Sequence, residues 1–189
     1  MSNAPSLRRT DKLMTDAETL ACLQAGYCGR LATVGADGYP YCLPLLYVCL
    51  DGKVLVHGTV ERGHLRRNLE ANARVCFEID LPGEVFDYGR FECDISVAYR
   101  SVIVFGKAAI VEDQALKQRF CATLMAKYGK ADTGRPKGFF PRLHLINVYA
   151  ITLERLTGKQ QALPPINEQW PAVDRSATPD AVPPRTTSS

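Results

Sequence analysis

Alternating apolar and polar residues in the first half of the chain predict short β-strands joined by tight turns. The predicted strands cover residues 28–34, 40–50, 53–58 and 74–80. Gly35-Ala36-Asp37-Gly38 and Asp51-Gly52 separate the first three strands and are typical of hairpin turns. Pro40 and Pro44 have no N–H to donate to a neighbouring strand, so the strand at 40–50 is expected at a sheet edge or a bulge.

Start and stop signals predict three helices. Thr15-Asp16-Ala17-Glu18 forms a capping box, and the helix that follows it is expected to end at Gly26. A second helix is predicted at 62–71, where leucines recur four residues apart on one face. Asp113 is the predicted cap of a third helix, which ends at Gly129.

The second half of the chain alternates between strands and loops. Loops are predicted at 81–91 and 130–142, and strands at 92–111 and 145–156. Strands at short spacing with few helices favour a mainly β fold, specifically a β-barrel with flanking helices. Closing the sheet into a barrel also removes its exposed edges.

Composition divides the chain into one folded domain and two tails. Residues 1–12 are polar and are predicted to be disordered, residues 13–160 form the predicted domain, and residues 161–189 form a proline-rich tail that cannot build a core. Trp170 is unusual in such a tail. It either docks on the domain or on a partner, or it is incidentally exposed.

Charge and composition argue against several classes of function. The net charge of +3 and the scattered basic residues disfavour nucleic-acid binding. The N-terminus has no apolar core, and the longest apolar run, Cys42 to Leu50, is far shorter than the roughly 20 residues that span a bilayer. We therefore expect a soluble, cytoplasmic protein with no membrane association. The chain also has neither a Gly-x-Ser-x-Gly motif nor a P-loop motif, which argues against a serine hydrolase or a P-loop enzyme.

The seven cysteines are expected to be reduced thiols. Their number is odd, and none of them forms a Cys-x-x-Cys pair. A metal site is not predicted, because zinc ligands usually come in closely spaced pairs.

The segment from Val54 to Asn68 predicts a seat for a phosphate group. It has the pattern of an apolar strand, a glycine-containing turn and a basic helix. Backbone N–H groups at a helix start are unpaired, and the helix dipole adds roughly half a positive charge there. Two arginines and a histidine bring basic side chains to the same place. The stretch from Arg100 to Ala108 is predicted to be a strand lining the same cavity, so the two stretches favour a phosphorylated cofactor on a β-barrel.

Three motifs in this order resemble the pyridoxamine 5′-phosphate oxidase-like, FMN-binding split-barrel proteins. They are Ala32-Thr33-Val34-x-x-Asp37-Gly38-x-Pro40-Tyr41, the strand–turn–helix at 54–75 ending in Asn72-Ala73-Arg74-Val75, and Arg100-Ser101-Val102-x-Val104-x-Gly106-Lys107-Ala108. The step His57-Gly58-Thr59 looks closest to the nitroimidazole-resistance (Nim-type) flavoprotein branch. Thr157-Gly158-Lys159, placed after the final predicted strand, also fits the family.

The resemblance implies a homodimer with FMN at the subunit interface and a substrate pocket built from both chains. The implied activity is an oxidoreductase that reduces a small nitroaromatic or quinone-like acceptor. FAD, a deazaflavin and haem remain alternative cofactors. A flavin- or haem-binding storage or sensor protein without turnover is the alternative function, and true pyridoxamine-phosphate oxidase activity ranks lower.

Site residues follow from the same resemblance. Leu43 and Leu46 are placed along the flavin, and Ser101 at the polar edge of its ring. Gly58 and Thr59 are placed against the flavin or its ribityl phosphate.

The sequence departs from the family at one phosphate position. His64 and Leu65 fall where the family commonly has basic phosphate ligands, and Leu65 stands where a lysine is frequent. Either FMN binds through Thr59, helix N–H groups and Arg66, or another ligand is used.

Two further residues carry open interpretations. His57 either lies beside the flavin, where it delivers a proton or binds substrate, or is a satisfied core histidine. Arg30 is a charge in an apolar strand and must reach water, a partner or a ligand. With Gly63 in the turn before the helix, the predicted cofactor-binding set is Arg30, Leu43, Leu46, Gly58, Thr59, Gly63, His64, Leu65, Arg66 and Ser101.

Overall fold

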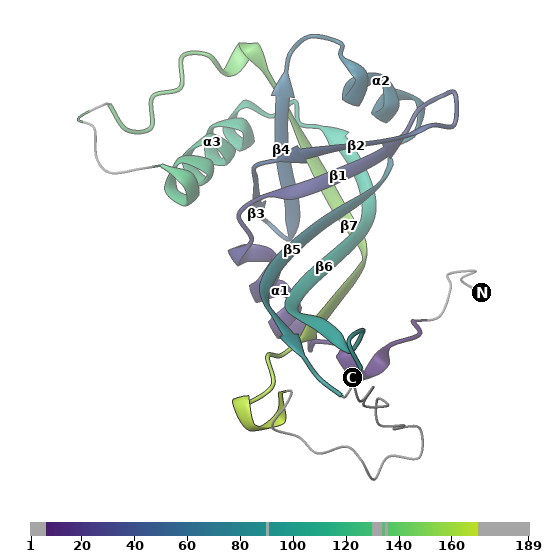
Figure 1. Cartoon of the computed structure of the whole chain (residues 1–189). Helices are drawn as coiled ribbons and strands as arrows, with labels where there is room; N and C mark the ends of the chain where they lie inside the picture. The colour runs from purple at the N-terminus through teal and green to yellow at the C-terminus, as the bar shows by residue number, and fades with distance from the viewer. Residues whose placement is uncertain (1–6, 90, 130–133, 135, 170–189) are drawn as a thin grey trace, which may run out of the picture. The chain divides into compact units, whose positions relative to one another are not determined.

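A computed structural model describes residues 7–89, 91–129, 134 and 136–169 (Figure 1). In this part of the chain the strands form one seven-stranded sheet in the order β2-β1-β5-β6-β7-β4-β3. The strands are β1 (Gly29–Val34), β2 (Pro40–Leu45), β3 (Tyr47–Leu50), β4 (Lys53–Thr59), β5 (Arg74–Asp87), β6 (Ile95–Ile110) and β7 (Ile146–Gln161). The helices are α1 (Asp16–Ala25), α2 (His64–Ala71) and α3 (Gln114–Tyr128), with short 3₁₀ turns at Thr10–Lys12, Leu143–Leu145 and Ile166–Glu168.

The chain divides into two compact units. The larger unit comprises Met14–Asp80 and Ser101–Gly158, and it contains all three helices and part of every strand. The described residues of the smaller unit are 7–13, 81–89, 91–100 and 159–169, where β5, β6 and β7 continue.

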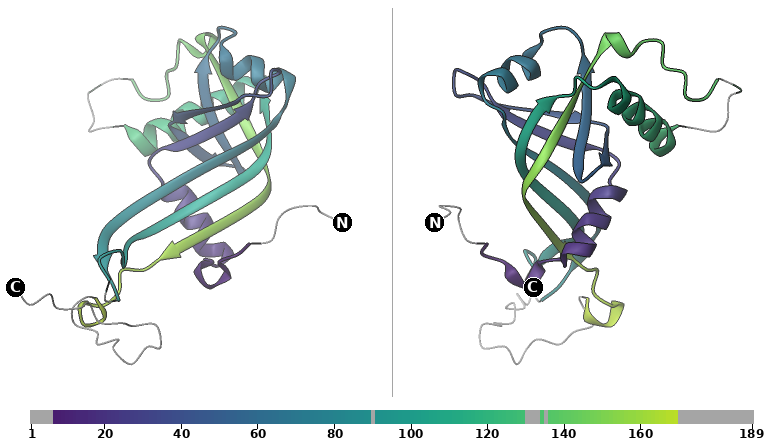
Figure 2. Two further views of the ribbon diagram at one scale, coloured as in Figure 1. Left: turned by 45° about the vertical axis from the view of Figure 1, so that its right-hand side comes forward. Right: turned by 180° about the vertical axis from the view of Figure 1, so that it is seen from behind.

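The larger unit is a barrel, because its two edge strands are neighbours in the sequence. β2 and β3 lie at opposite edges of the sheet, yet only Leu46 separates them. One connecting residue spans at most about 7 Å, so the sheet must curl until its edges meet (Figure 2). The predicted mainly β barrel with flanking helices is confirmed, and β2 is an edge strand as its prolines indicate. The single strand predicted at 40–50 is wrong, because the chain turns at Leu46 from one edge to the other.

Local signals place the turns and helix ends as predicted. The Thr15 hydroxyl accepts from the Glu18 N–H, and the Glu18 carboxylate accepts from the Thr15 N–H at 2.8 Å. Asp113 caps α3 by accepting from the Ala115 N–H at 2.8 Å. In the β3–β4 hairpin, Asp51 and Gly52 both have positive φ, at 52° and 70°.

The core has two layers on the two faces of the barrel wall. Inside the barrel, fully buried residues of neighbouring strands pack together, among them Leu31, Val56, Phe77, Val104 and Tyr149. Outside it, α3 covers β3, β4 and β7 (Figure 2). This second cluster consists of Val48, Leu55, Val111, Phe120, Leu124, Val148 and Ala150.

Two strands run further than predicted. The loop predicted at 81–91 is wrong in its first part, because β5 continues to Asp87 beside β6. Gly83 permits this close pairing, since a Cβ there would lie 3.0 Å from the Ala98 carbonyl oxygen. β6 begins at Ile95 rather than at 92. β7 extends to Gln161 rather than to 156, so Thr157-Gly158-Lys159 lies within the strand and not after it. Residues 170–189, with Trp170, lie outside the described residues.

A half-buried lysine whose ammonium nitrogen is itself buried lies at the C-terminal end of α3. The Lys127 ammonium is 3.9 Å from the ring centroid of Tyr47 and 5.2 Å from that of Tyr128, and within the described residues it has no hydrogen-bond partner. Burial lowers the pKa of Lys127 below its ordinary value of 10.5. The aromatic faces attract the charge, but they do not replace the lost hydration.

We expect Lys127→Met to stabilise the fold by about 1 kcal/mol at pH 7, because it removes a buried charge while keeping the apolar stem. The unfolded chain binds the Lys127 proton more tightly, so wild-type stability should rise towards that of the variant between pH 7 and 9.5. Urea unfolding at both pH values measures this. Lys53→Met, at an exposed lysine of β4, is the control and should show no such convergence.

Candidate functional site

The corner between β4 and α2 is held rigidly by the start of β7. The Asn147 side-chain amide donates to the Thr59 carbonyl at 3.1 Å and to the Val60 carbonyl at 3.2 Å. The Val60 N–H donates to the Leu145 carbonyl at 3.0 Å. Asn147 is only 7% exposed, so these two bonds fix the backbone of the turn from inside the protein.

The N-terminus of α2 opens from this corner without a side-chain cap. Gly63 is the N-cap residue, and no side chain within the described residues accepts from the first helical N–H groups. His64, the first helical residue, stacks on Tyr41 of β2 with ring centroids 4.3 Å apart and an interplanar angle of 14°. The backbone N–H groups of the first turn of α2 are therefore open donors at the corner, and stacking on Tyr41 holds the His64 ring beside them.

The predicted phosphate ligand Arg66 is part of an ion cluster. Its Nε donates to Glu70 Oε1 at 2.9 Å, and the Arg62 guanidinium lies 2.7 Å from Glu70 Oε2. Arg66 also donates to the Val60 carbonyl at 3.3 Å. Hydrogen bonds from Arg62 and Arg66 lower the pKa of Glu70, so the cluster holds two positive charges and one negative charge at neutral pH.

A buried tyrosine lies next to the corner. Tyr149 of β7 is 2% exposed, and a Cβ on Gly58 would lie 3.8 Å from its ring. Burial raises the pKa of Tyr149, while the nearby Arg66 charge and a hydrogen bond with Asn147 act in the opposite direction. Tyr149, Asn147 and Glu70 thus join Gly58, Thr59 and Arg66 in one neighbourhood.

The predicted leucines have other contacts. Leu43 is half-buried and pairs with Leu31 across the β1–β2 ladder. Leu46 packs against the α3 cluster outside the barrel. Leu65 is half-buried in the first turn of α2, where it provides no charge.

Arg30 and Ser101 lie on the outward face of the sheet, on β1 and β6 rather than on β4 or α2. Arg30 pairs with Asp80 and, at 3.3 Å, with Glu78, so its charge finds partner carboxylates on β5. Ser101 alternates along β6 with the buried Val102, which faces the barrel interior.

His57 lies on the side of β4 that faces α3. Its ring centroid is 5.6 Å from that of Phe120, and its buried Nδ1 has no hydrogen-bond partner within the described residues. Burial lowers the pKa of His57 below its ordinary value of 6.5. The His57 imidazole is therefore neutral at neutral pH.

We expect His57 to make the fold more sensitive to acid. The unfolded chain binds the His57 proton more tightly than the folded chain does. The contribution of neutral His57 to the free energy of unfolding is therefore fully present above pH 6.5, and it is lost as the pH falls towards the lower pKa of the folded state. His57→Phe should therefore flatten the decline of the urea midpoint between pH 7.5 and 5. His144→Phe, at an exposed histidine, should leave the decline unchanged.

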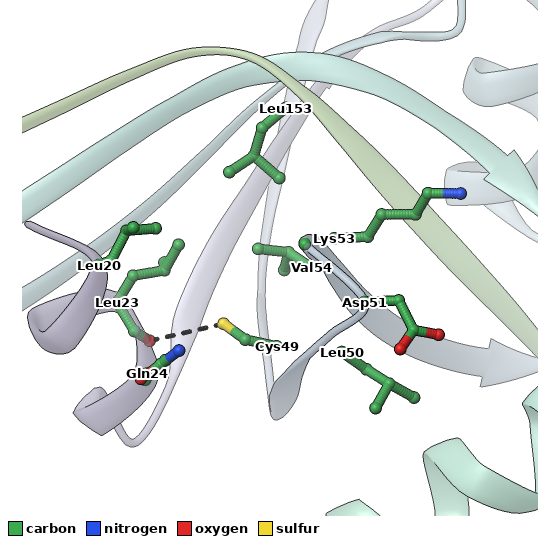
Figure 3. A pocket seen from close by; sticks show the side chains of 10 residues that line it. Leu20, Leu23, Gln24, Cys49, Leu50, Asp51, Lys53, Val54 and Leu153 are labelled. Atoms are coloured by element: carbon green, nitrogen blue, oxygen red, sulfur yellow. Dashed lines mark hydrogen bonds between the residues drawn. The ribbon is translucent and has the colours of Figure 1, made fainter. Parts of the chain in front are cut away.

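A small cavity in the larger unit lies apart from these residues (Figure 3). It has a volume of about 160 Å³ and is bounded by α1, the β3–β4 hairpin and Leu153 of β7. The Cys49 thiol in its wall donates to the Leu23 carbonyl at 3.9 Å, and burial raises the pKa of that thiol. None of the predicted site residues lines it.

Metal ligands do not gather in the described part of the chain, where no three His, Cys, Asp or Glu residues form a group that could hold a metal ion. All seven cysteines are free thiols. Among the helices of the described ranges, none combines the length and the apolar character needed to cross a membrane.

The curled seven-stranded sheet with its single-residue connection defines a split β-barrel. A family model described as pyridoxamine 5′-phosphate oxidase matches residues 15–160, so the chain belongs to this family. No curated protein sequence matches the chain.

Solved structures share the fold at low sequence identity. A candidate 5-nitroimidazole antibiotic resistance protein from Bacteroides thetaiotaomicron is 19% identical, with 79% of this chain and 86% of that chain covered and a TM-score of 0.65. The flavocytochrome Anf3 from Azotobacter vinelandii is 20% identical, with coverage of 93% and 79% and a TM-score of 0.73. The FAD and haem binding protein from Mycobacterium smegmatis is 21% identical, with coverage of 82% and 75% and a TM-score of 0.68.

Five residues of the corner were missed by sequence reasoning as site residues: Asn147, Glu70, Tyr149, Tyr41 and Arg62. Asn147 is a polar residue at the start of an apolar strand, which is a usable signal for an internal anchor. Glu70 follows Arg66 by four residues in a helix, the spacing of an ion pair. Tyr41 gave no local signal, because its stacking on His64 depends on the β2–α2 packing.

Proposed function

We propose that this protein is an FMN-dependent oxidoreductase of the split-barrel class, acting on a small nitroaromatic or quinone-like acceptor. The observation that carries the proposal is the β4–α2 corner, where uncapped helix N–H groups, Thr59 and two arginines converge on a backbone fixed by Asn147. Membership of a flavin-related family supports the choice of flavin.

The corner suits the phosphate of FMN. The exposed Thr59 side chain and the uncapped start of α2 provide hydrogen-bond donors, and Arg62 and Arg66 provide the charge that Leu65 lacks. We propose that Arg66 turns from Glu70 to the phosphate when the cofactor binds. Bound FMN would supply the hydride chemistry. We expect the chain to orient the ring and to exclude water from it, and burial keeps His57 neutral at neutral pH.

Glu70 competes with the phosphate for the two arginines. Glu70→Gln removes the negative charge between Arg62 and Arg66, so we expect it to tighten FMN binding by about 3- to 10-fold at low salt. Titration of the apoprotein with FMN, followed by flavin fluorescence, measures the change. Glu154→Gln, which frees Lys107 on β6, is the matched control and should leave the Kd unchanged. Unchanged binding in Glu70→Gln would count against a phosphate at Arg66.

A homodimer is part of the proposal, with the cofactor between the subunits. The outward face of the barrel exposes Val34, Ile103 and Phe105 at 40%, 39% and 39%, an apolar area suited to a second copy of the chain. An interface that encloses a cofactor needs roughly 2,000 Å² or more of buried surface. Ser101 lies on this face, where the partner's flavin ring would meet it.

Spectroscopy and turnover test the proposal directly. Protein purified from the cytoplasmic fraction should be yellow and dimeric, and mass spectrometry of the released cofactor should give FMN. NAD(P)H should reduce a nitroimidazole or a quinone in its presence. A Soret band would identify haem as the cofactor, and release of FAD or a deazaflavin would identify that flavin instead of FMN. A bound flavin without turnover would indicate a storage or sensor protein. Oxidation of pyridoxamine 5′-phosphate would assign the lower-ranked activity.

A further inference from the structure

His64 begins α2, and Tyr41 of the edge strand β2 holds its ring. The two ring centroids are 4.3 Å apart and the ring planes are inclined by only 14°, so the rings stack nearly parallel. Tyr41 is half-buried, whereas His64 is exposed. Tyr41 therefore covers one face of the imidazole and leaves the nitrogens at the ring edge open to a ligand.

A second contact beside the stack holds α2 against the same hairpin. Thr33 and Tyr41 are direct partners in the β1–β2 ladder, so their side chains lie on the same side of the sheet. His64 and Asn68 are four residues apart, so they lie on the same side of α2. The Asn68 amide donates to the Thr33 hydroxyl at 3.0 Å, and both of these residues are buried. Two neighbouring contacts thus join one side of α2 to the hairpin.

The imidazole nitrogens of His64 are not used by the protein itself. Within the described residues His64 makes the ring stack but no side-chain hydrogen bond or ion pair. Arg66, by contrast, is already bound to Glu70 and to the Val60 carbonyl. An imidazole carries an N–H donor in either of its neutral tautomers. The stack thus holds in place a donor that has no acceptor in this part of the chain.

His64 and Arg66 approach the space in front of α2 from different sides. Arg66 shares its side of the helix with Glu70, and His64 shares the other with Asn68. Side chains of a helix tilt towards its N-terminus, and these two occupy the first and third helical positions. The Arg66 guanidinium already extends in this direction, because it donates at 3.3 Å to the carbonyl of Val60, which precedes the helix. An anion in front of α2 would therefore lie between the two side chains.

We propose that Tyr41 is a positioning residue of the phosphate site: its ring holds the His64 imidazole where an N–H donates to a phosphate monoester. The identity of that ester as FMN rests on the proposed function. A free imidazole loses conformational entropy when it binds a ligand, whereas the stacked ring is ordered beforehand. Tyr41 thereby raises the affinity for the phosphorylated flavin and leaves the affinity for the unphosphorylated flavin unchanged.

Titration of the full-length apoprotein with FMN and with riboflavin, which lacks the phosphate, distinguishes positioning from general support of the fold. We expect Tyr41→Leu to raise the Kd of FMN by about 5- to 20-fold and to change the Kd of riboflavin by less than about twofold. Tyr41→Phe keeps a stacking ring, so its Kd for FMN should lie within about twofold of the wild-type value. Equal losses for the two flavins, or an unchanged Kd of FMN in Tyr41→Leu, overturn the proposal.

Tyr39→Leu is the matched control. Tyr39 lies in the turn between β1 and β2 and is 75% exposed. Its backbone N–H donates to the Asp37 carboxylate at 3.1 Å, a bond that leucine keeps. Both flavins should therefore bind this variant as they bind the wild type. A loss of FMN binding equal to that in Tyr41→Leu would assign the effect to the hairpin as a whole and overturn the role of the stack.

A measurement without flavin uses the three histidines of the chain. Their imidazole NMR signals are assigned with His57→Phe and His144→Phe, and the full-length apoprotein is titrated with inorganic phosphate at constant pH and ionic strength. The signals of His64 should move, and in Tyr41→Leu the same movement should need at least about fivefold more phosphate. His64 signals that phosphate does not move, or that move equally in the two proteins, overturn the proposal.

The two measurements separate this proposal from the proposed function. A protein that binds no flavin, but in which phosphate moves the His64 signals in a manner that depends on Tyr41, refutes the proposed function and supports the positioning role. A yellow, active protein whose His64 signals do not respond to phosphate does the reverse.

Discussion

The double variant Thr59→Ala, Arg66→Ala is expected to lose FMN during purification. Removing a hydroxyl and a guanidinium from a phosphate costs roughly 3–5 kcal/mol in total, which corresponds to an increase of the Kd by about 100-fold or more. Both side chains lie at the corner that Asn147 fixes, and Arg62 is the arginine that remains beside them in the variant. Absorbance at the flavin band and fluorescence titration of the apoprotein measure the loss.

A matched double variant distinguishes this effect from a general loss of surface charge. Thr123→Ala, Arg119→Ala removes the same two side-chain types from α3, where Arg119 pairs with Asp51 at 2.8 Å. It should retain flavin at the wild-type level. Stoichiometric flavin in the Thr59, Arg66 variant would place the phosphate elsewhere.

Asn147→Asp is expected to have the second large effect, on stability and cofactor binding together. The amide of Asn147 donates to two carbonyls, and an aspartate in its place would direct a carboxylate at both of them in a buried position. We expect the free energy of unfolding to fall by about 3 kcal/mol at pH 7, and FMN binding to weaken because the corner is released. Urea unfolding and flavin titration on the same samples measure both.

Asn72→Asp is the control for this change. Asn72 ends α2, and its side-chain oxygen accepts from the Arg74 N–H at 3.1 Å, a bond that an aspartate keeps. The free energy of unfolding of the Asn72→Asp variant should remain within about 0.5 kcal/mol of the wild-type value. Equal behaviour of the two variants would show that the Asn147 bonds do not hold the corner.

Local sequence signals were sufficient for elements whose ends are set by a few adjacent residues. The capping box at Thr15, the aspartate cap of α3 and the Asp51-Gly52 turn all form as predicted. The first part of the predicted loop at 81–91 failed for a non-local reason. Pro82 and Gly83 usually interrupt strands, but β6 lies alongside and supplies the pairing that keeps this segment extended.

In the candidate site too, features set by adjacent residues were predictable and features set by distant contacts were not. The strand, the turn and the basic helix of the corner follow from the sequence, and the structure brings Gly58, Thr59, Gly63 and Arg66 together there. The break at Leu46 was not predictable, because it depends on where the two edges of the sheet meet. Which of the predicted residues contact a cofactor stays a prediction.

The order of strands also determines how the protein must fold. The β1–β2 and β3–β4 hairpins form between neighbouring segments, whereas the ladder from Lys53↔Thr152 to Thr59↔Ile146 joins residues far apart in the chain. Closing so long a loop is slow, so refolding on a timescale of milliseconds to seconds is expected. Before β7 pairs with β4, the backbone hydrogen-bonding groups of the apolar run Val54–Val56 on that edge have no partner strand. We expect this exposed edge to promote aggregation during refolding at high protein concentration.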